Sequence, residues 1–386
     1  MKAMKLIMCG TMVPSEYENR IQYLSNAANR FQLNFVKEMK KECEIKVYSY
    51  LGIAVDELVQ TELKQENGDV KVHFRTADRL TGVMRYKRAV KQALKQADCL
   101  ITYNVTYAWM FAPALARRLG KKSALILADY SGEESYHSFV RRLYARFQLR
   151  GIQKYDLVIG LSETTRRYLQ PNQRFLCVEG GIDQDVYDYF GQVSAEDQQH
   201  EDGITTYMYA GILEPVTGVD MLLKAFSQIR NPSVRLKISG KGSFQQLVED
   251  AAKQDERITY LGCVPYEEYL SNLKQADVLV NPRNMNLPEN ENNFPSKIME
   301  YLATGKPIIS TRFPGWEKYN KYITFCESTV EGLQNALEIS DAGRDREKEQ
   351  RKFAASFLWS NQVKKIQSLL MEQSGKIEKH FREETK

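Results

Sequence analysis

Short apolar runs alternate with helix-like stretches along the first 180 or so residues. The runs lie at 5–10, 44–50, 71–75, 99–104, 123–130, 156–162 and 175–181. Helical patterns lie between them, at 21–42, 82–97, 107–119 and 137–154. A strand followed by a helix at intervals of about 20–30 residues predicts βαβ crossovers and a parallel sheet. The middle runs are almost wholly apolar, as expected for strands that helices cover on both faces.

The pattern stops in a polar segment and then begins again. Residues 188–204, DYFGQVSAEDQQHEDGI, have no period, and we place an inter-domain linker at 191–204. Further strands are predicted at 206–211, 234–242, 258–264, 278–283, 306–311 and 322–327. Helices are predicted between them, at 218–229, 244–253, 266–275, 296–304 and 329–339. The sequence therefore predicts two doubly wound α/β domains, at 1–190 and 205–350.

The tail of the chain has its own pattern. Residues 353–370, FAASFLWSNQVKKIQSLL, carry an apolar stripe suited to docking on a protein surface. We predict that 351–386 forms a helix that returns to the first domain.

Composition places the chain among ordinary globular proteins. Its 386 residues exceed one usual core, and the hydrophobic and charged fractions of 43% and 27% are typical. No apolar run reaches the roughly 18–20 residues of a membrane span. The N-terminus lacks a signal-peptide pattern, so we expect a cytoplasmic protein. Six scattered cysteines and four histidines predict a reducing compartment and no metal site.

Positive charge is concentrated in the first domain. Residues 71–150 hold 16 Lys and Arg against 5 Asp and Glu, whereas residues 201–386 hold 25 against 26. Two runs carry much of the excess, at 85–95 and 140–150. A basic amphipathic helix can bind an anionic membrane surface or nucleic acid, or form a solvated face over a core stripe. No nucleic-acid motif accompanies these runs, so the membrane and the solvated face stay open as interpretations.

The most informative stretch runs from 278 to 311. It predicts a strand, a polar loop, a helix that opens at Pro295-Ser296-Lys297, and another strand after Gly305. A helix N-terminus favours anions, so Lys297 costs about 0.3–1 kcal/mol there unless an anion binds. Glu300 lies one turn further on the same face, where its carboxylate can accept hydrogen bonds from a vicinal diol.

Several motifs of the second domain appear together in one protein family. They are YAG (209–211), SGKG (239–242), LGCVPYEE (261–268), ADVLVNPR (276–283) and EYLATGKPII (300–309). In this order they resemble family-4 glycosyltransferases, which are retaining enzymes. The resemblance is strongest over 206–320. It implies an α/β GT-B fold, in which two Rossmann-like doubly wound parallel-sheet domains face a central cleft.

The resemblance implies a donor site in the second domain. It gives Glu300 the ribose hydroxyls of a nucleotide-sugar, and it brings the backbone of Phe294, Pro295 and Ser296 to the diphosphate and sugar. Gly211 and Lys241 belong to the two turns that would line the site.

This chain departs from the family pattern at three positions. The first acidic residue of the family motif is replaced by Asn292, with Glu289 and Glu291 nearby. Ile212 and Thr217 stand where many members have the Arg and Lys that clamp the diphosphate. A leaving diphosphate needs positive charge, so we expect Lys241, Arg283 and Lys297 to supply it.

Candidates in the first domain follow strand ends. Gly10 and Thr11 end the opening strand, and Asn29 and Arg30 lie in the next helix, where they could meet acceptor hydroxyls. Asp129 ends the strand at 123–130. The resemblance implies that a residue there contacts the transferred sugar or the acceptor, and we count Asp129 with Lys297 and Arg283 as catalytic.

The resemblance implies a retaining hexosyltransferase that binds no metal through an Asp-x-Asp motif. No such motif follows a strand here, since DQD (183–185) precedes the linker. We expect a UDP-sugar donor, a saccharide or polyprenyl-linked acceptor in surface-polysaccharide or glycan synthesis, no other cofactor and no nucleic acid. Peripheral contact with the inner face of the cell membrane is a further expectation. The alternative is a catalytically silent partner subunit, motivated by Asn292, Ile212 and Thr217.

Overall fold

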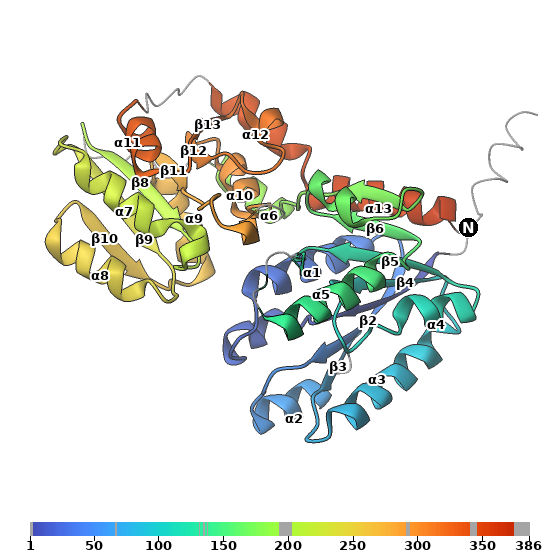
Figure 1. Cartoon of the computed structure of the whole chain (residues 1–386). Coiled ribbons are helices and arrows are strands. Elements are labelled where there is room, and N and C mark those ends of the chain that lie inside the picture. The colour runs from blue at the N-terminus through green and yellow to red at the C-terminus, as the bar shows by residue number, and fades with distance from the viewer. Residues whose placement is uncertain are drawn as a thin grey trace, which may run out of the picture. The chain divides into compact units, whose positions relative to one another are not determined.

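The computed structural model divides the chain into two compact units. It describes residues 3–65, 68–130, 132–133, 136, 138–192, 203–290, 294–339 and 346–373. The first unit runs to Gly181 and takes up the chain again from Trp359, and the second unit is Ile182–Leu358. Figure 1 labels helices and strands of both units where there is room.

The first unit contains a parallel sheet in the order β3-β2-β1-β4-β5-β6-β7. Its strands are β1 (Lys5–Gly10), β2 (Glu44–Leu51), β3 (Val70–Phe74), β4 (Cys99–Tyr103), β5 (Lys122–Leu127), β6 (Leu157–Gly160) and β7 (Arg174–Cys177). The strand order reverses between β1 and β4, which pair in register from Leu6 with Cys99 to Cys9 with Thr102. In open α/β sheets a ligand binds outside the carboxyl ends of the strands at such a reversal.

Five of the helices in the first unit connect its strands. They are α1 (Asn26–Met39), α2 (Glu57–Gln65), α3 (Arg79–Leu94), α4 (Ala112–Arg118) and α5 (Phe139–Ile152). Helix α3 buries Tyr86, Val90 and Leu94 at helical spacing, and these pack in one apolar cluster with Trp109 and the first residues of α4. In Figure 1, α3 and α4 lie beside each other on the sheet.

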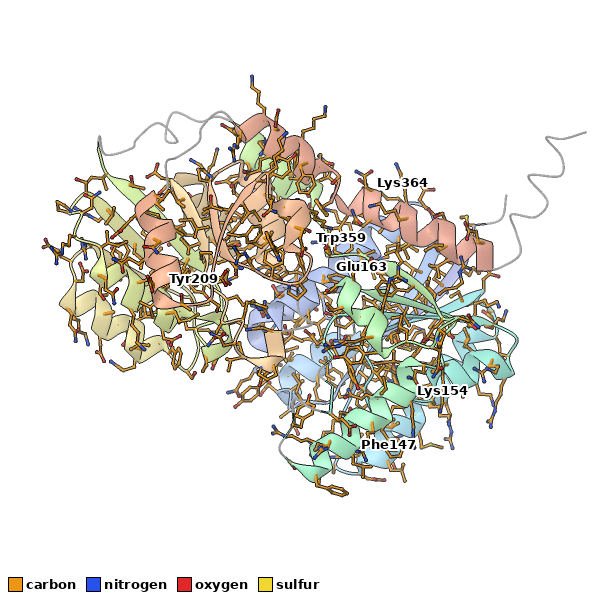
Figure 2. The ribbon with its side chains drawn as sticks, turned by 45° about the horizontal axis from the view of Figure 1, so that its top comes forward. Phe147, Lys154, Glu163, Tyr209, Trp359 and Lys364 are labelled. Atoms are coloured by element: carbon orange, nitrogen blue, oxygen red, sulfur yellow. The ribbon has the colours of Figure 1, made fainter. Side chains whose placement is uncertain are left out.

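The last described helix packs in the first unit. Helix α13 (Trp359–Gln373) contacts α1. The Trp359 ring meets the edge of Phe31 at a centroid distance of 4.8 Å, and a Cβ on Gly181 would come 2.3 Å from the Trp359 ring. Figure 2 labels Trp359 where α13 begins. The glycine at 181 therefore lets the crossing chain pass close to this tryptophan.

The second unit repeats the same plan. Its parallel sheet has the order β10-β9-β8-β11-β12-β13. The strands are β8 (Thr205–Ala210), β9 (Val234–Ser239), β10 (Ile258–Gly262), β11 (Val278–Asn281), β12 (Ile308–Thr311) and β13 (Ile323–Cys326). The order reverses between β8 and β11, so the binding edge of this unit lies where these two strands end.

The second unit contains seven described α-helices. They are α6 (Gln184–Gly191), α7 (Val219–Gln228), α8 (Gln245–Gln254), α9 (Tyr266–Gln275), α10 (Lys297–Thr304), α11 (Val330–Ile339) and α12 (Glu347–Ala355). Helix α10 is short, but it buries Ile298, Met299, Tyr301 and Leu302. It is held by α12 and α6, which pack against it. The first turn of α10 is thus fixed by the core.

The predicted elements differ from the structure in three places. Helix α2 was not predicted, because its apolar positions Val59 and Leu63 are too few to give a clear period. Helix α6 counts with the second unit, since the Tyr187 hydroxyl donates to the Arg351 carbonyl, so the boundary is at Gly181 and not near 190. The tail is two helices, and only α13 returns to the first unit. Within the described residues, no helix is long and apolar enough to cross a bilayer.

Candidate functional site

The turn after β8, at the reversal of the second sheet, lies close against its neighbours. Gly211 has φ of 151°, and a Cβ there would come 2.6 Å from Lys297 Nζ. Gly240, in the turn after β9, has φ of 148°, and its Cβ would collide with the Gly211 carbonyl oxygen at 1.8 Å. The two turns therefore touch through their backbones, which only glycine permits. Glycine in the SGKG turn is therefore explained by this close approach of two backbones.

Lys297 opens α10 and reaches back over this turn. Its Nζ lies 4.2 Å from the centroid of the Tyr209 ring, and no described residue forms a hydrogen bond or ion pair with it. Removal from water and, to a smaller extent, the positive charge of Arg283 lower the pKa of Lys297 to about 7, while Glu300 opposes the shift. An ammonium group without a counter-ion, at a helix N-terminus, is suited to an incoming anion.

Glu300 lies one turn after Lys297 and is held by two tyrosines of α9. The Tyr266 hydroxyl donates to Oε1 at 3.0 Å, and the Tyr269 hydroxyl donates to Oε2. Burial and the Glu300 charge raise the pKa of Tyr269 well above its usual value, so its hydroxyl stays a donor. A carboxylate has about four acceptor positions, so two bonds fix its orientation and leave room for further donors.

Arg283 follows β11 and is fixed by a buried amide. Its Nε donates to Asn290 Oδ1 at 2.6 Å. The Asn290 amide nitrogen in turn donates to the carbonyls of Val216 and Asn284, both at 2.7 Å. Asn290 thereby ties the loop after β11 to the turn after β8, and it holds the guanidinium beside Lys297.

The three other positions discussed for the diphosphate carry no fixed charge into this site. Ile212 is exposed, and the Thr217 hydroxyl donates to the Glu214 carbonyl at 2.7 Å. Lys241 is exposed on its turn, where its carbonyl accepts a hydrogen bond from the Leu213 N–H. Of the three candidate cations, Arg283 and Lys297 lie together, and Lys241 is attached to the neighbouring turn.

The segment before α10 contributes backbone. The Phe294 ring is buried and meets the Phe313 ring at 5.3 Å, so its side chain belongs to the core. Pro295 has no N–H, so among Phe294, Pro295 and Ser296 it can bring only its carbonyl and ring toward a ligand. Ser296 is exposed and its N–H remains available for a ligand in the first turn. Asn292 lies outside the described residues.

In the first unit, the turn after β1 is closed by a glutamine. Gln32 Oε1 accepts from the Thr11 N–H at 3.1 Å, and its amide nitrogen donates to the Thr11 hydroxyl. A Cβ on Gly10 would lie 2.1 Å from the same Oε1. Gly10 and Thr11 thus sit at the reversal point, with Gln32 fixing their backbone.

Asn29 and Arg30 are occupied by their own chain. Asn29 is 1% exposed, and its side-chain amide bonds both the N–H and the carbonyl of Val13. The expectation that Asn29 meets acceptor hydroxyls was therefore wrong, since it braces the loop from inside. Arg30 forms an ion pair with the buried Glu18 at 3.3 Å.

Asp129 is exposed just after β5, and Asn104 holds its position. Asn104 Oδ1 accepts from the N–H groups of Ala128 and Asp129, and Asn104 Nδ2 donates to the Asp129 carboxylate at 3.3 Å. Asn104 has φ of 55°, a left-handed conformation that asparagine tolerates better than most residues. This unusual conformation marks the edge of the sheet next to β1.

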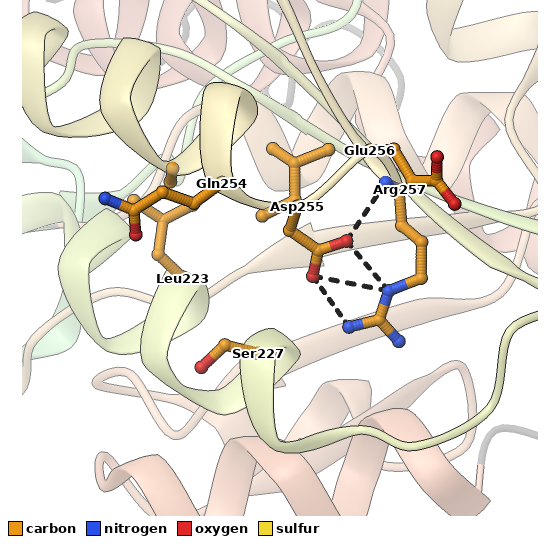
Figure 3. Close-up of a pocket in the computed structure, with 8 residues that line it drawn as sticks. Leu223, Ser227, Gln254, Asp255, Glu256 and Arg257 are labelled. Carbon is orange, nitrogen blue, oxygen red and sulfur yellow. Dashed lines mark hydrogen bonds and ion pairs between the residues drawn. The ribbon is translucent and has the colours of Figure 1, made fainter.

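A separate pocket of about 460 Å³ lies at the opposite edge of the second sheet, where β10 begins. Figure 3 shows Asp255 and Arg257 joined across it by dashed interactions. Arg257 lowers the pKa of Asp255, and its guanidinium also donates to the carbonyls of Ile229 and Asn231. Asp255 and Arg257 are paired with each other, so these two charges favour fold stability over ligand binding.

The structure thus brings Gly211, Arg283, Lys297 and Glu300 together at the reversal of the second sheet. Sequence analysis missed Tyr266, Tyr269 and Asn290, which orient these groups, and Gln32 and Asn104 in the first unit. The spacing of Tyr266 and Tyr269, three residues apart on one helix face, was the available signal for that pair.

Comparisons with known proteins agree with this architecture. Residues 205–338 match the family described as Glycosyl transferases group 1. Among curated protein sequences, none matches the chain.

Solved structures resemble the whole chain. The structure of Anabaena Alr3699/HepE in complex with UDP has a TM-score of 0.71 at 15% identity, covering 96% of this chain and 100% of that one. Sucrose-phosphate synthase from Thermosynechococcus elongatus has a TM-score of 0.70 at 14% identity, covering 96% and 99%. At these identities the similarity establishes the shared fold.

Proposed function

We propose that the chain is a glycosyltransferase, since residues 205–338 match the family described as Glycosyl transferases group 1 and the whole chain has a GT-B fold. It moves a hexose from a UDP-sugar, with retention of configuration, to a saccharide or lipid-linked acceptor in surface-polysaccharide or glycan synthesis. Complexes of Alr3699/HepE with UDP and with UDP-glucose support the choice of nucleotide.

One observation carries the proposal. Lys297 and Glu300 stand one helical turn apart at the strand reversal, the first without a counter-ion among the described residues and the second oriented by Tyr266 and Tyr269. A nucleoside diphosphate offers the matching chemistry, because its phosphates are anionic and its ribose carries a vicinal diol.

The roles follow from these positions. The Glu300 carboxylate accepts hydrogen bonds from the ribose hydroxyls, and the Lys297 ammonium binds the diphosphate with the N–H groups at the start of α10. Arg283, fixed by Asn290, adds a second positive charge. Together they replace the Arg and Lys that Ile212 and Thr217 do not provide.

The reaction breaks the bond between the sugar C1 and the phosphate oxygen and forms a bond from C1 to the acceptor oxygen. The acceptor proton passes to the departing phosphate on the same face. The negative charge that develops on the diphosphate is stabilised by Lys297 and Arg283, which is the kind of term that dominates such catalysis. Asp129, held by Asn104, is assigned to the acceptor, and the proposal requires no metal ion.

The test is a panel of nucleotide-sugars screened by thermal shift, followed by donor hydrolysis and transfer assays with retention checked by NMR of the product. We expect a UDP-sugar to raise the melting temperature of the native protein and of Glu331→Gln, a matched change in the first turn of α11. Glu300→Gln should lose most of that shift. Equal shifts in both variants would contradict the ribose assignment.

The second candidate function is a catalytically silent partner subunit that binds nucleotide or glycan. It is favoured by the absence of a cation at Ile212 and Thr217. The Thr217 hydroxyl donates to the Glu214 carbonyl. Such a protein would bind UDP in calorimetry but would neither hydrolyse nor transfer any donor of the panel. Turnover of one UDP-sugar rules this candidate out.

A further inference from the structure

Helix α5 turns its large apolar side chains toward solvent. Phe139, Leu143 and Phe147 are 76%, 45% and 49% exposed, and Val140 and Tyr144 are exposed beside them. Figure 2 labels Phe147 on this helix at the margin of its unit. Surface helices of globular proteins usually bury such a stripe, so α5 is inverted with respect to the ordinary pattern.

The side of α5 that faces the unit is narrow and small. Its buried residues are Ala145, Gly151 and Ile152. Two hydrogen bonds anchor it, from the Tyr130 hydroxyl to the Ala145 carbonyl and from Gln148 to the Val105 carbonyl. Phe139, Leu143 and Phe147 take no part in these two bonds.

Charge follows the apolar stripe. Phe139, Leu143 and Phe147 form one row at four-residue spacing, and Arg142, Arg146 and Arg150 form the adjacent row at the same spacing. The helix contains no Asp or Glu. Arg146 is paired with Glu133, so most of the arginine row keeps its net positive charge.

The other basic helix of the first unit provides the contrast. Helix α3 buries Tyr86, Val90 and Leu94 in the core and exposes Arg85, Arg88 and Lys91. It is a solvated basic face over a core stripe, which was one of the two interpretations left open for both runs. Helix α3 exposes two large apolar side chains, Leu80 and Met84, whereas α5 exposes five beside its arginine row.

We propose that the face of α5 formed by Phe139, Val140, Leu143, Tyr144, Phe147 and the arginine row docks on an anionic lipid surface. The apolar row would enter the boundary of headgroups and acyl chains, while the arginines stay level with the lipid phosphates. A row of large apolar side chains flanked by one sign of charge fits this partner, since it satisfies both rows at once.

The surface has a use that rests on the proposed function. Tyr130 follows Asp129 directly and bonds α5, so the docked helix is tied to the carboxyl end of β5. A lipid-linked acceptor could then be presented to Asp129 from the membrane. Lipid binding itself requires neither donor nor acceptor, so it can be tested separately from transfer.

The test is co-sedimentation of the full chain with vesicles of phosphatidylcholine, alone or mixed with phosphatidylglycerol, at low and high salt. One variant removes charge from α5, Arg142→Gln with Arg150→Gln. Its matched control removes the same charge from α3, Arg85→Gln with Arg88→Gln. A third variant, Phe139→Ser with Phe147→Ser, removes apolar surface. Far-ultraviolet circular dichroism and UDP thermal shift verify that each variant is folded.

We expect the native chain to prefer the anionic vesicles. The α5 charge variant should bind them about 30-fold more weakly, because each basic side chain near the surface contributes roughly fivefold. The α3 control should change much less, and the apolar variant should lose at least about tenfold at both salt concentrations.

Equal losses in the α3 and α5 charge variants would overturn the proposal, because the effect would then be one of net charge. Equal binding to both kinds of vesicle, or none to either, would also overturn it. If Phe139→Ser with Phe147→Ser leaves vesicle binding intact but dissolves an oligomer seen by light scattering, the face is a protein interface and the proposal fails.

Discussion

The carboxyl edges of the two sheets have the same topology, but their polar side chains differ in whether they bond within the fold or remain able to bind a ligand. In the second unit, Lys297 has no counter-ion among the described residues, and Glu300 keeps acceptor capacity beyond its two tyrosines. In the first unit, the side chains of Asn29 and Gln32 form hydrogen bonds with the backbone of the loop after β1. One edge is thus prepared for a charged ligand, and the other is built mainly for its own stability.

This difference indicates which parts of the chain would recognise the diphosphate and which would recognise the acceptor. A diphosphate is a strong and constant ligand, and one short segment, 294–300, carries most of the groups proposed to bind it. The first edge offers Asp129 as its exposed charge, positioned by Asn104. If this edge recognises the acceptor, its selectivity must come from few fixed groups and from the surrounding surface, such as that of α5.

The largest expected effect is at Lys297. Lys297→Met should lower kcat by roughly 100- to 1000-fold, since it removes positive charge from the site of the departing diphosphate, and KM for the donor should rise less. Steady-state transfer kinetics measure both. Lys224→Met, an exposed change on α7 in the same unit, is the control. A loss confined to KM would mean that Lys297 serves ground-state binding only.

The next effect is at Glu300. Glu300→Ala should lower kcat/KM for the donor by about ten- to a hundredfold, because a hydrogen bond to a charged group contributes about 1.5–3 kcal/mol. Tyr269→Phe removes only one bond that orients the carboxylate, so its loss should be smaller and should appear mainly in KM. Unchanged donor kinetics in Glu300→Ala would break the comparison at its stronger side.

At Asn29 the comparison predicts a loss of stability with no loss of donor binding. Asn29→Ala leaves the N–H and carbonyl of Val13 unpaired in the interior, which should destabilise the first unit by about 1–3 kcal/mol. Denaturant unfolding measures this change. Calorimetry should find UDP affinity unaltered, and a loss of UDP binding without a loss of stability would show that the first edge takes part in the donor site.

The smallest expected effect is one of pH. Lys297, with a pKa of about 7 between Arg283, Glu300 and the Tyr209 ring, is largely neutral at pH 8 and must take up a proton to meet a diphosphate. UDP binding at pH 8 should therefore take up about one proton, and affinity should fall by up to about tenfold per pH unit as pH rises above 7. Calorimetry in buffers of different ionisation enthalpy measures the uptake.

The lowered pKa of Lys297 also predicts how the stability of the protein changes with pH. An unfolded lysine stays protonated up to its ordinary pKa of 10.5, whereas folded Lys297 is neutral above about 7. The unliganded protein should therefore gain stability from this residue as pH rises from 7 toward 10.5. Both effects should vanish in Lys297→Met, and their persistence there would assign them to another group.

Much of the fold could be predicted because the spacing of apolar residues in helices and in strands is a local feature of the sequence. The strand predicted at 278–283 and the helix at 296–304 correspond closely to β11 and α10. Helix α2 failed because its buried stripe is short, and α6 because a polar, aperiodic neighbourhood hid its contact with Arg351. Such contacts are tertiary, so no local pattern reports them.

The site was predictable only where a motif carried it. Glu300 and Lys297 stand in a recognisable segment, whereas Tyr269 reaches Glu300 from another helix, 31 positions earlier in the chain. Asn290 in a polar loop gave no signal that its amide would fix Arg283. For α5 the period was visible, but the direction of its apolar row depends on how the helix packs on the sheet.

A crystal structure of the protein with UDP tests the central claim most directly. The account predicts the diphosphate within hydrogen-bond distance of Lys297 Nζ at the first turn of α10, with the ribose hydroxyls on the Glu300 carboxylate. A nucleotide that binds elsewhere, with that turn unchanged and Glu300 bonded only to Tyr266 and Tyr269, would contradict it.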